Sequence, residues 1–317
     1  MSADNSDAAL TFGRFLSFDG TQLAYQLCGP RDPDPDHLPI VLTNGLGGDY
    51  RAWKYVLDRF GPKPGAKGHT LVTWDYRGLY RSEPPRTPGT LGPAFQALDL
   101  KALLDHLGWN KVLLVGWSMG VQVNFEAWRR FPERVAGICV INGVAGSPFH
   151  TALGTRLSRY VIPSVVKQMR RWSRVVGKVS SLATSWSGLL PIMVRLGFVG
   201  ATIDMQMFAE FARTFASLDF NLYGATLQAL GRHDAYDVLP TITVPVRIIT
   251  GDRDMMTPLA TARRLEEEIP HARLRVLTGA THYTPVEFPA EVCQEIEAVL
   301  RDATPATSGV GARGAQR

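Results

Sequence analysis

Cysteine is scarce in this chain. Only three of its 317 residues are cysteines, Cys28, Cys139 and Cys293, and they are widely spaced. This number and spacing exclude a disulfide framework and a cysteine-rich zinc site. They favour a reducing compartment, in which the three cysteines are small core or surface residues.

Membrane-directing signals are missing as well. The sequence has no run of about eighteen or more uninterrupted apolar residues, so no transmembrane helix is expected. Asp4 and Asp7 stand near the N-terminus, where a signal peptide has a basic segment followed by an apolar run. We therefore expect a soluble, cytoplasmic protein without a signal peptide.

Acidic residues are absent from one long stretch. The formal net charge is only +5, but no Asp or Glu occurs between Arg134 and Ile203, where Lys and Arg recur. Metal and nucleotide motifs are also lacking, since there is no H-E-x-x-H, P-loop or G-x-G-x-x-G. We expect no metal and no organic cofactor. We also expect no nucleic-acid partner, because no recognition motif accompanies the basic stretch.

Short apolar runs alternate with helical patterns along most of the chain. Two β-rich runs, 11–18 and 21–27, flank Asp19-Gly20, a pair typical of a hairpin turn. Further runs follow at 39–43, 70–74, 111–115 and 135–141, separated by helical patterns at 50–60, 93–107 and 118–130. This alternation predicts an α/β fold with a parallel sheet covered on both faces.

The alternation stops after Asn142 and resumes at residue 244. The residues between have helical patterning, and we expect a helical cap inserted over residues 146–231. The predicted α/β core comprises residues 10–145 and 232–302. Residues 1–9 and 303–317 are expected to be disordered tails.

Gly116-Trp117-Ser118-Met119-Gly120 is a G-x-S-x-G motif between a predicted strand and a predicted helix. A serine on such a tight turn has an exposed hydroxyl, and the N-terminus of the following helix stabilises negative charge. A serine that only caps the helix is the simpler alternative. We expect Ser118 to be a nucleophile.

A serine hydroxyl needs a base, and the base needs an orienting carboxylate. His282 follows the last predicted strand, at the sheet edge where parallel sheets bind ligands. His150 and His233 flank the insertion and are weaker candidates. The carboxylate comes from Asp252 or Asp254, which both follow the preceding strand, and spacing alone does not separate them.

From about residue 11 to 301 the chain resembles the α/β-hydrolase family, in which the triad follows the order Ser, Asp, His. The resemblance implies a mostly parallel, eight-stranded sheet. It places the acid at the last residue of a G-x-x-D turn, Asp254, and makes Asp252 a turn residue. Some members carry the acid one core strand earlier, near Asn142, which is not an acid. Dehalogenases and epoxide hydrolases of the family use an aspartate nucleophile, and Ser118 argues against both.

The resemblance also assigns an oxyanion hole. Its donors are the backbone N–H groups of Met119 and of Leu46. Leu46 follows Asn44-Gly45, where family members commonly have His-Gly. The loop at 75–82 resembles the family's D-x-R-G-x-G-x-S loop with Tyr80 in place of the second glycine, and it is expected to be structural.

An amphipathic helix is expected within the insertion, with Pro163 in its first turn and apolar residues from Val161 to Val179. In one interpretation the apolar face packs on the core and the basic face is solvated. In the other the helix lies on an anionic membrane, with Trp172 at the boundary. A second apolar helix over 205–215 favours an apolar acyl- or aryl-binding pocket.

The predicted function is that of an esterase or monoacylglycerol-lipase-like enzyme. It would hydrolyse carboxylic esters with a hydrophobic acyl group through an acyl-enzyme at Ser118. A lactonase, a thioesterase, a carbon–carbon bond hydrolase or an acyltransferase would use the same triad. A further alternative is a non-catalytic ligand receptor on the same scaffold, because such a receptor can retain the triad. The expected partner is a small ester or lipid substrate.

Overall fold

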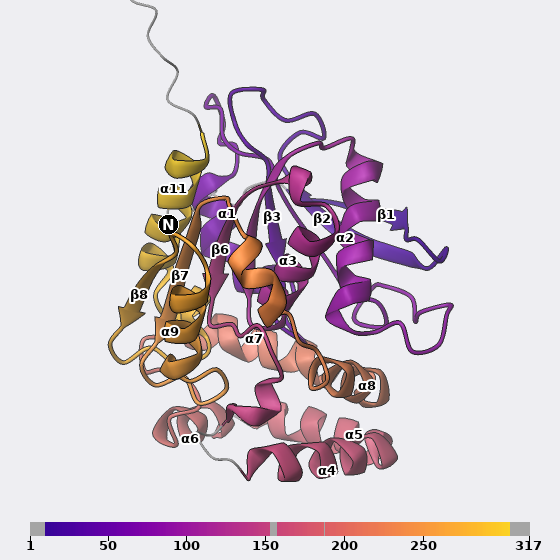
Figure 1. The fold of residues 1–317 in the computed structure, drawn as a ribbon. Helices are drawn as coiled ribbons and strands as arrows, with labels where there is room; N and C mark the ends of the chain where they lie inside the picture. The colour runs from indigo at the N-terminus through magenta and orange to yellow at the C-terminus, as the bar shows by residue number, and fades with distance from the viewer. Residues whose placement is uncertain (1–9, 153–156, 187, 305–317) are drawn as a thin grey trace, which may run out of the picture.

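The computed structural model describes residues 10–152, 157–186 and 188–304. Their centre is an eight-stranded sheet with the order β1-β2-β4-β3-β5-β6-β7-β8 (Figure 1). Strand β2 is antiparallel to both of its neighbours, and the other neighbouring strands are parallel. The prediction of an eight-stranded, mostly parallel sheet is confirmed. The strands are β1 (Leu10–Leu16), β2 (Gln22–Cys28), β3 (Ile40–Thr43), β4 (Leu71–Trp74), β5 (Val112–Trp117), β6 (Val135–Ile141), β7 (Val246–Gly251) and β8 (Arg273–Leu277).

The predicted hairpin is confirmed between β1 and β2. Gly20 has a φ of 78°, which glycine adopts without strain, and the Ser17 N–H donates to the Thr21 carbonyl over 2.9 Å. The helical pattern at 50–60 divides into a short 3-10 turn, η1 (Tyr50–Trp53), and helix α1 (Lys54–Phe60).

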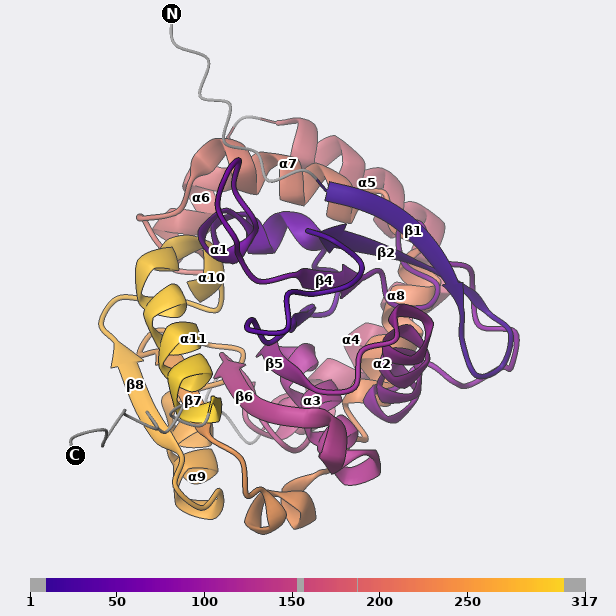
Figure 2. The same ribbon diagram turned by 90° about the horizontal axis from the view of Figure 1, so that it is seen from above.

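Helices cover both faces of the sheet (Figure 2). Helices α1 and α11 contact each other on one face, and α2 and α3 contact each other on the opposite face, where α9 packs on β7 and β8. The bounds of these core helices are α2 (Pro93–Leu107), α3 (Met119–Arg130), α9 (Leu259–Glu268), α10 (Thr284–Glu287) and α11 (Pro289–Ala303). Helix α11 therefore extends one residue beyond the predicted end of the core.

The central strands supply two separate cores. In β5, Val112 and Leu114 belong to the core under α2 and α3, whereas Leu113 and Val115 belong to the core under α1 and α11. Successive side chains of a strand point to opposite faces, so a strand covered on both sides is apolar throughout. This explains why the sequence shows continuous apolar runs here rather than alternation.

The three cysteines are free and buried in the core under α1 and α11. Burial raises the pKa of the Cys28 and Cys293 thiols to about 11 and that of Cys139 still further. Thiols with such pKa values stay protonated at neutral pH and are poor nucleophiles.

The insertion follows β6 and gathers below the sheet in the view of Figure 1. Its described part begins with a 3-10 turn, η3 (Pro148–His150). Five helices follow: α4 (Ser158–Arg171), α5 (Ser173–Ser185), α6 (Leu189–Arg195), α7 (Met205–Ala216) and α8 (Phe220–Leu230). Helix α7 confirms the second apolar helix, and the Asp204 side chain caps it by accepting from the N–H groups of Gln206 and Met207. Another 3-10 turn, η5 (Tyr236–Thr241), leads back to β7.

The single amphipathic helix predicted from the Val161–Val179 pattern is wrong. The chain changes direction at Trp172, which has φ −108° and ψ 26° and lies between α4 and α5. Pro163 is the sixth residue of α4 rather than part of its first turn. The pattern did not reveal the break, because apolar residues continue at helical spacing on both sides of Trp172.

The expectation that the apolar face of this segment packs on the core is also wrong for half of its eight apolar residues. Val166 is buried, but Val161, Val165, Trp172 and Val179 are exposed. Helix α4 buries a different stripe, because its main contacts are with α8 and η3. The predicted tails lie almost entirely outside the described residues. Among the described helices, none is long and apolar enough to cross a membrane.

Candidate active site

Ser118 lies on the turn between β5 and α3, with φ 56° and ψ −118°. This backbone conformation is strained for a residue with a side chain, and such strain is found where it serves a site. Two backbone hydrogen bonds hold the turn: Ser118 N donates to Ile141 O, and Val121 N donates to Ser118 O, both over 3.0 Å. The side chain is half-buried at the end of the strand.

The two glycines of the motif are required by close packing. A Cβ at Gly120 would lie 2.1 Å from the Thr43 carbonyl oxygen of β3. A Cβ at Gly116 would lie 2.5 Å from the Asn124 side-chain amide and 2.9 Å from the backbone of Gly120. The strand, the turn and the helix therefore approach one another more closely than any side chain allows.

The structure brings the three predicted triad residues together. The distance from Ser118 Oγ to His282 Nε2 is 2.9 Å, and that from His282 Nδ1 to Asp254 Oδ2 is 2.8 Å. An ionised carboxylate only accepts hydrogen bonds, so Nδ1 carries the proton and donates to Asp254. In the neutral ring, Nε2 is then free to accept from the serine hydroxyl. His282 and Asp254 are both buried.

Asp254 is held as a carboxylate by four further donors. Oδ1 accepts from the backbone N–H groups of Met256 and Thr257, and Oδ2 accepts from the Thr257 hydroxyl and the Asn142 amide. Burial alone raises the pKa of Asp254, but the neighbouring His282 and the Thr257 hydrogen bonds outweigh it and keep the pKa below its usual value. The group is thus ionised at neutral pH.

Asn142 is the first of three supporting residues that sequence reasoning missed. It follows β6 with a φ of 46°, and its amide donates to Asp254 Oδ2 over 2.7 Å and to the Thr281 carbonyl over 3.2 Å. Its position at the end of a core strand was the only signal in the sequence. The side chain joins the acid to the loop that carries the base.

Glu287 is the second, and it holds the loop of His282 from the other side. Its buried carboxylate accepts from the Thr281 N–H (2.8 Å), the Thr281 hydroxyl (2.6 Å) and the Gly200 N–H (2.6 Å). Gly200 belongs to the insertion, between α6 and α7. One carboxylate therefore ties the base-bearing loop of the core to the insertion, and no motif indicated it.

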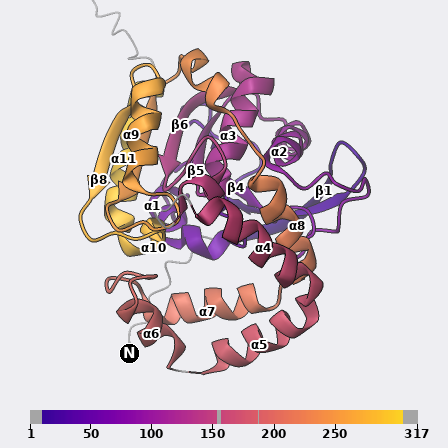
Figure 3. The same ribbon diagram turned by 60° about the horizontal axis from the view of Figure 1, so that its bottom comes forward.

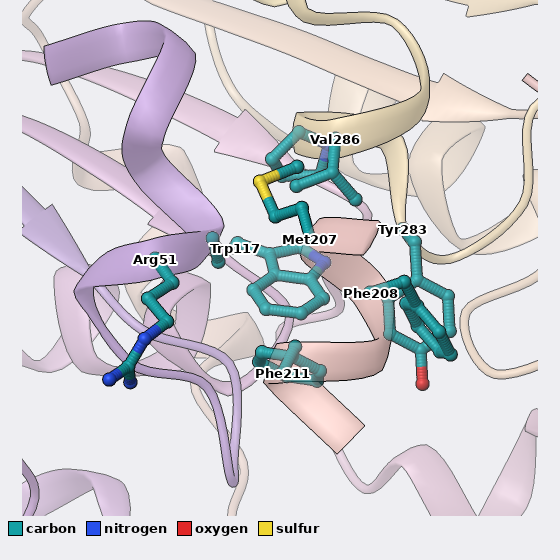
Figure 4. A pocket seen from close by; sticks show the side chains of 9 residues that line it. Arg51, Trp117, Met207, Phe208, Phe211, Tyr283 and Val286 are labelled. Atoms are coloured by element: carbon teal, nitrogen blue, oxygen red, sulfur yellow. The ribbon is translucent and has the colours of Figure 1, made fainter. Parts of the chain in front are cut away.

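Trp117 is the third. Its indole N–H donates to the His282 carbonyl over 2.8 Å, and its ring packs so closely on Gly45 that a Cβ there would lie 3.0 Å away. Figure 4 shows this ring beside a small cavity, together with Phe211 of α7 and Tyr283. The ring centroids of Phe211 and Tyr283 lie 6.4 and 6.0 Å from that of Trp117. Trp117, the residue before the nucleophile, thus contacts the Gly45 loop, the His282 loop and α7 of the insertion.

The loop expected to supply the second oxyanion donor is held by Asn44, which replaces the more common histidine. Asn44 is fully buried. Its Nδ2 donates to the Trp74 carbonyl (2.9 Å), its Oδ1 accepts from the Trp53 indole (2.7 Å), and its carbonyl accepts from the Tyr76 hydroxyl (2.7 Å). The asparagine therefore anchors the start of the loop to β4 and η1.

The loop at 75–82 supports the same region. Tyr80 has a φ of 51°, a conformation that glycine adopts more easily, and its hydroxyl donates to the Gly47 carbonyl. Arg77 is fully buried and paired with Asp99 and Asp19. These contacts are structural, and the tyrosine adds a tie to the Asn44–Gly48 loop that a glycine lacks.

A cavity of about 450 Å³ opens over Ser118 and His282. The core supplies Leu46, Trp117 and Met256, and helices α4 to α8 supply most of the remaining wall. The described lining residues include no Asp, Glu, Lys or Arg, and besides His282 the titratable ones are Tyr223 and Tyr283. Burial raises the pKa of Tyr283 to about 12 and that of Tyr223 still further, so both phenols stay neutral.

The remaining candidates lie elsewhere. Asp252 is exposed and accepts from the Gly279 N–H over 2.7 Å, which makes it a turn residue. His233 pairs with Glu126 over 2.9 Å at the far end of α3, and His150 is exposed on η3. Neither histidine lines the cavity.

Comparison with known proteins identifies the family of this chain. Residues 40–295 match the model of the "Alpha/beta hydrolase family". The chain is 26% identical over 266 residues to "3-oxoadipate enol-lactonase 2" of Acinetobacter baylyi, covering 84% of this chain and 90% of that protein. It is 24% identical over 267 residues to a "putative carbamate hydrolase" of Caulobacter, covering 81% and 88%.

Solved structures share the fold. A thermophilic esterase from Thermogutta terrifontis superposes with a TM-score of 0.71 at 22% identity, covering 92% of this chain and 99% of that one. The enol-lactonase from Burkholderia xenovorans gives a TM-score of 0.68 at 22% identity, covering 91% and 100%. Because the family model covers most of this chain, the family of the protein is established. The protein is a member of the alpha/beta hydrolase family.

Proposed function

We propose that this hydrolase cleaves carboxylic esters with a hydrophobic acyl group, through an acyl-enzyme on Ser118. One observation carries the proposal: the continuous hydrogen-bonded chain from Ser118 through His282 to Asp254 at the floor of an apolar cavity. We further propose that residues 10–145 and 232–302 act as the catalytic core and residues 146–231 as its cap.

In the proposed first step, Ser118 Oγ attacks the ester carbonyl carbon while His282 Nε2 takes the hydroxyl proton. Asp254 stabilises the imidazolium that forms and holds the ring in the tautomer that accepts this proton. The tetrahedral intermediate then collapses. Its C–O bond to the leaving alcohol breaks, and the proton passes from Nε2 to the alcohol oxygen.

In the second step, water attacks the acyl-enzyme and gives its proton to His282 Nε2. The acid is released and Ser118 regains its proton. Both tetrahedral intermediates carry an oxyanion, for which we propose the N–H groups of Leu46 and Met119 as donors. In the described part of the chain, neither N–H donates to a protein acceptor. Both are therefore free to bind this oxygen.

The cavity supports a neutral, apolar acyl group. Its walls contain Phe149, Phe208, Phe211 and Leu227, and no Lys or Arg stands among the described lining residues. Burying an unpaired carboxylate in such walls is costly, whereas burying an alkyl chain is favourable. Its volume of about 450 Å³ is in the range of small-molecule sites.

Lactone hydrolysis is a second candidate, because an enol-lactonase stands among both the sequence relatives and the solved structures. The chemistry is the same, since a lactone is a cyclic ester. The absence of a cation among the described lining residues disfavours a lactone that bears a carboxylate, such as one derived from an oxoadipate. An uncharged lactone with an alkyl substituent fits the walls better.

The test is hydrolysis of nitrophenyl esters from acetyl to dodecanoyl, beside an uncharged alkyl lactone. Ser118→Ala is compared with Ser217→Ala, a matched change at an exposed serine of the insertion. We expect a rise of kcat/KM with acyl length, lost only in Ser118→Ala. Turnover that persists in Ser118→Ala contradicts the nucleophile. A preference for acetyl, or for the lactone over every ester, contradicts the proposed substrate.

A further inference from the structure

Helix α4 exposes an apolar stripe on its outer side. Val161 and Val165 of α4, and Trp172 directly after its last residue, recur at positions i, i+4 and i+11, which places them on one side of the helix. The inner side of the same helix is occupied, since Val166 is buried and Ile162 lines the cavity over Ser118. The outer stripe is therefore additional to the face that packs.

Helix α5 repeats this arrangement. Its outer stripe comprises Val175, Val179 and Leu182, followed by Trp186 directly after its last residue, at i, i+4, i+7 and i+11. The seven side chains of the two stripes are 47–76% exposed. Figure 1 shows α4 and α5 at the bottom edge of the view, with α7 and α8 between them and the sheet, and Figure 3 shows α5 at the lower edge with α7 between it and the core. We call the two stripes and the cations around them the outer surface of the insertion.

The charge of this surface has one sign. Residues 158–195 include seven Lys and Arg and no Asp or Glu. Arg170 is used within the fold, bonding to Asn221 and Gln228. The other six are exposed, and in the part of the chain that the structure describes none of them forms an ion pair. These six are Arg159, Lys167, Arg171, Arg174, Lys178 and Arg195.

We propose that the outer surface of the insertion binds the surface of an anionic lipid bilayer. Apolar and aromatic side chains that project from a basic helical surface are the composition of interfacial helices, which bury their apolar side at the headgroup boundary. Each Lys or Arg held near anionic lipid adds electrostatic attraction. The tryptophan that ends each stripe is suited to the headgroup level.

A second copy of the chain fits this surface less well than lipid does. Two such surfaces placed face to face oppose cations with cations and offer no carboxylate between residues 158 and 195 to pair them. Like charges directly opposed are repulsive. An anionic lipid headgroup supplies the missing charge, and the acyl region accepts the valines, the leucine and the tryptophans.

The location of the surface gives it a relation to the active site. The helices that would lie on the bilayer also form the cavity wall, through Ile162 of α4 and through Ser180, Ala183 and Thr184 of α5. An apolar ester dissolved in the bilayer would thus be held next to the wall of the proposed acyl site. Binding itself does not depend on the proposed function, and it is tested without turnover.

The test uses intrinsic fluorescence. Five of the seven tryptophans are buried, and only Trp172 and Trp186 are exposed. We expect a blue shift of the emission, and co-sedimentation, with vesicles of phosphatidylcholine containing about a third phosphatidylglycerol. The vesicle affinity obtained from either signal should be at least tenfold lower for pure phosphatidylcholine. It should also fall as the salt concentration is raised, because screening weakens the attraction between surface charges. The full chain with Ser118→Ala should bind like the wild type.

Two double variants separate the contributions, Val165→Ser with Val179→Ser, and Arg171→Glu with Lys178→Glu. Each should reduce binding to the anionic vesicles at least tenfold and leave hydrolysis of a soluble acetyl ester unchanged. Leu16→Ser and Lys111→Glu, at exposed positions of the core, are the matched controls and should bind as the wild type does. Equal binding to neutral and anionic vesicles, or no effect of the double variants, overturns the proposal. A dimer that forms in the absence of vesicles, and that the same double variants dissociate, also overturns the proposal.

Discussion

Glu287 offers the sharpest test of how the base is positioned. Its carboxylate accepts three hydrogen bonds, at 2.6–2.8 Å, from Thr281 and Gly200. Glu287→Ala leaves these three donors in a buried site without their acceptor. Hydrogen bonds to charged groups contribute about 1.5–3 kcal/mol each, and water entering the vacated space recovers part of this. We expect a net loss of about 4 kcal/mol in the free energy of unfolding.

Such a loss corresponds to a fall of roughly 10 °C in the melting temperature of a domain of this size. The activity should fall too, because Thr281 precedes the base. A displacement of about 1 Å at a catalytic group costs as much as about a hundredfold in rate. We therefore expect kcat to fall at least about tenfold with little change in KM, since Glu287 does not line the cavity. Calorimetry and ester kinetics measure the two effects.

Glu291→Ala is the matched control, because Glu291 is an acidic residue in the first turn of α11 that holds no loop. It should lose only about 0.3–1 kcal/mol, the usual contribution of an acid at a helix N-terminus. Glu287→Gln, which keeps one acceptor oxygen, should fall between the two. If Glu287→Ala matches Glu291→Ala in both melting temperature and kcat, the role given to this carboxylate is refuted.

Three further predictions concern the acid and the turn. Asn142→Gly accommodates the left-handed backbone but removes the hydrogen bond that the side-chain amide donates to Asp254. The value of kcat/KM should fall at least about tenfold, in line with a charge-assisted hydrogen bond of about 1.5–3 kcal/mol. An unchanged kcat/KM would show that Asn142 has no role in the site. Gly120→Ala should abolish folding or serine labelling by a fluorophosphonate, because its Cβ meets a backbone oxygen at 2.1 Å, whereas Gly92→Ala, with 3.4 Å to its nearest neighbour, should be silent. The pKa of Asp254 is below its usual 3.8, so the ionised carboxylate stabilises the fold above pH 3.8, and this contribution is lost as the pH falls below that value. The difference in unfolding free energy between the wild type and Asp254→Asn should therefore shrink below about pH 3.8. A difference that does not change with pH would contradict this.

The residues of the triad could be predicted from the sequence, whereas the residues that position the triad could not. Ser118 lies in a local motif, and Asp254 and His282 each follow a strand in the order that the resemblance requires. Glu287 and Asn142 act through contacts between segments that are far apart in the chain. Neither belongs to a motif, because a buried carboxylate or amide has no local pattern.

Parts of the fold could likewise be predicted from the sequence, and other parts could not. Continuous apolar runs identified the buried strands, because a strand covered on both faces has no polar side. The insertion was harder, because helical spacing reveals that a stripe is apolar but not what it contacts. Val165 and Val166 are adjacent in sequence, yet one is exposed and the other is buried against the neighbouring helices. Only the packing of α4 on α8 decides between them.

The central claim is that Ser118 carries the acyl group during turnover. It is tested most directly by mass spectrometry of the intact protein, quenched in acid while it hydrolyses a nitrophenyl ester with a long acyl chain. The account predicts an adduct of one acyl group on Ser118 that disappears when the ester is consumed, and no adduct and no turnover in Ser118→Ala. Turnover at an undiminished rate in Ser118→Ala, or an adduct on another residue, would contradict it.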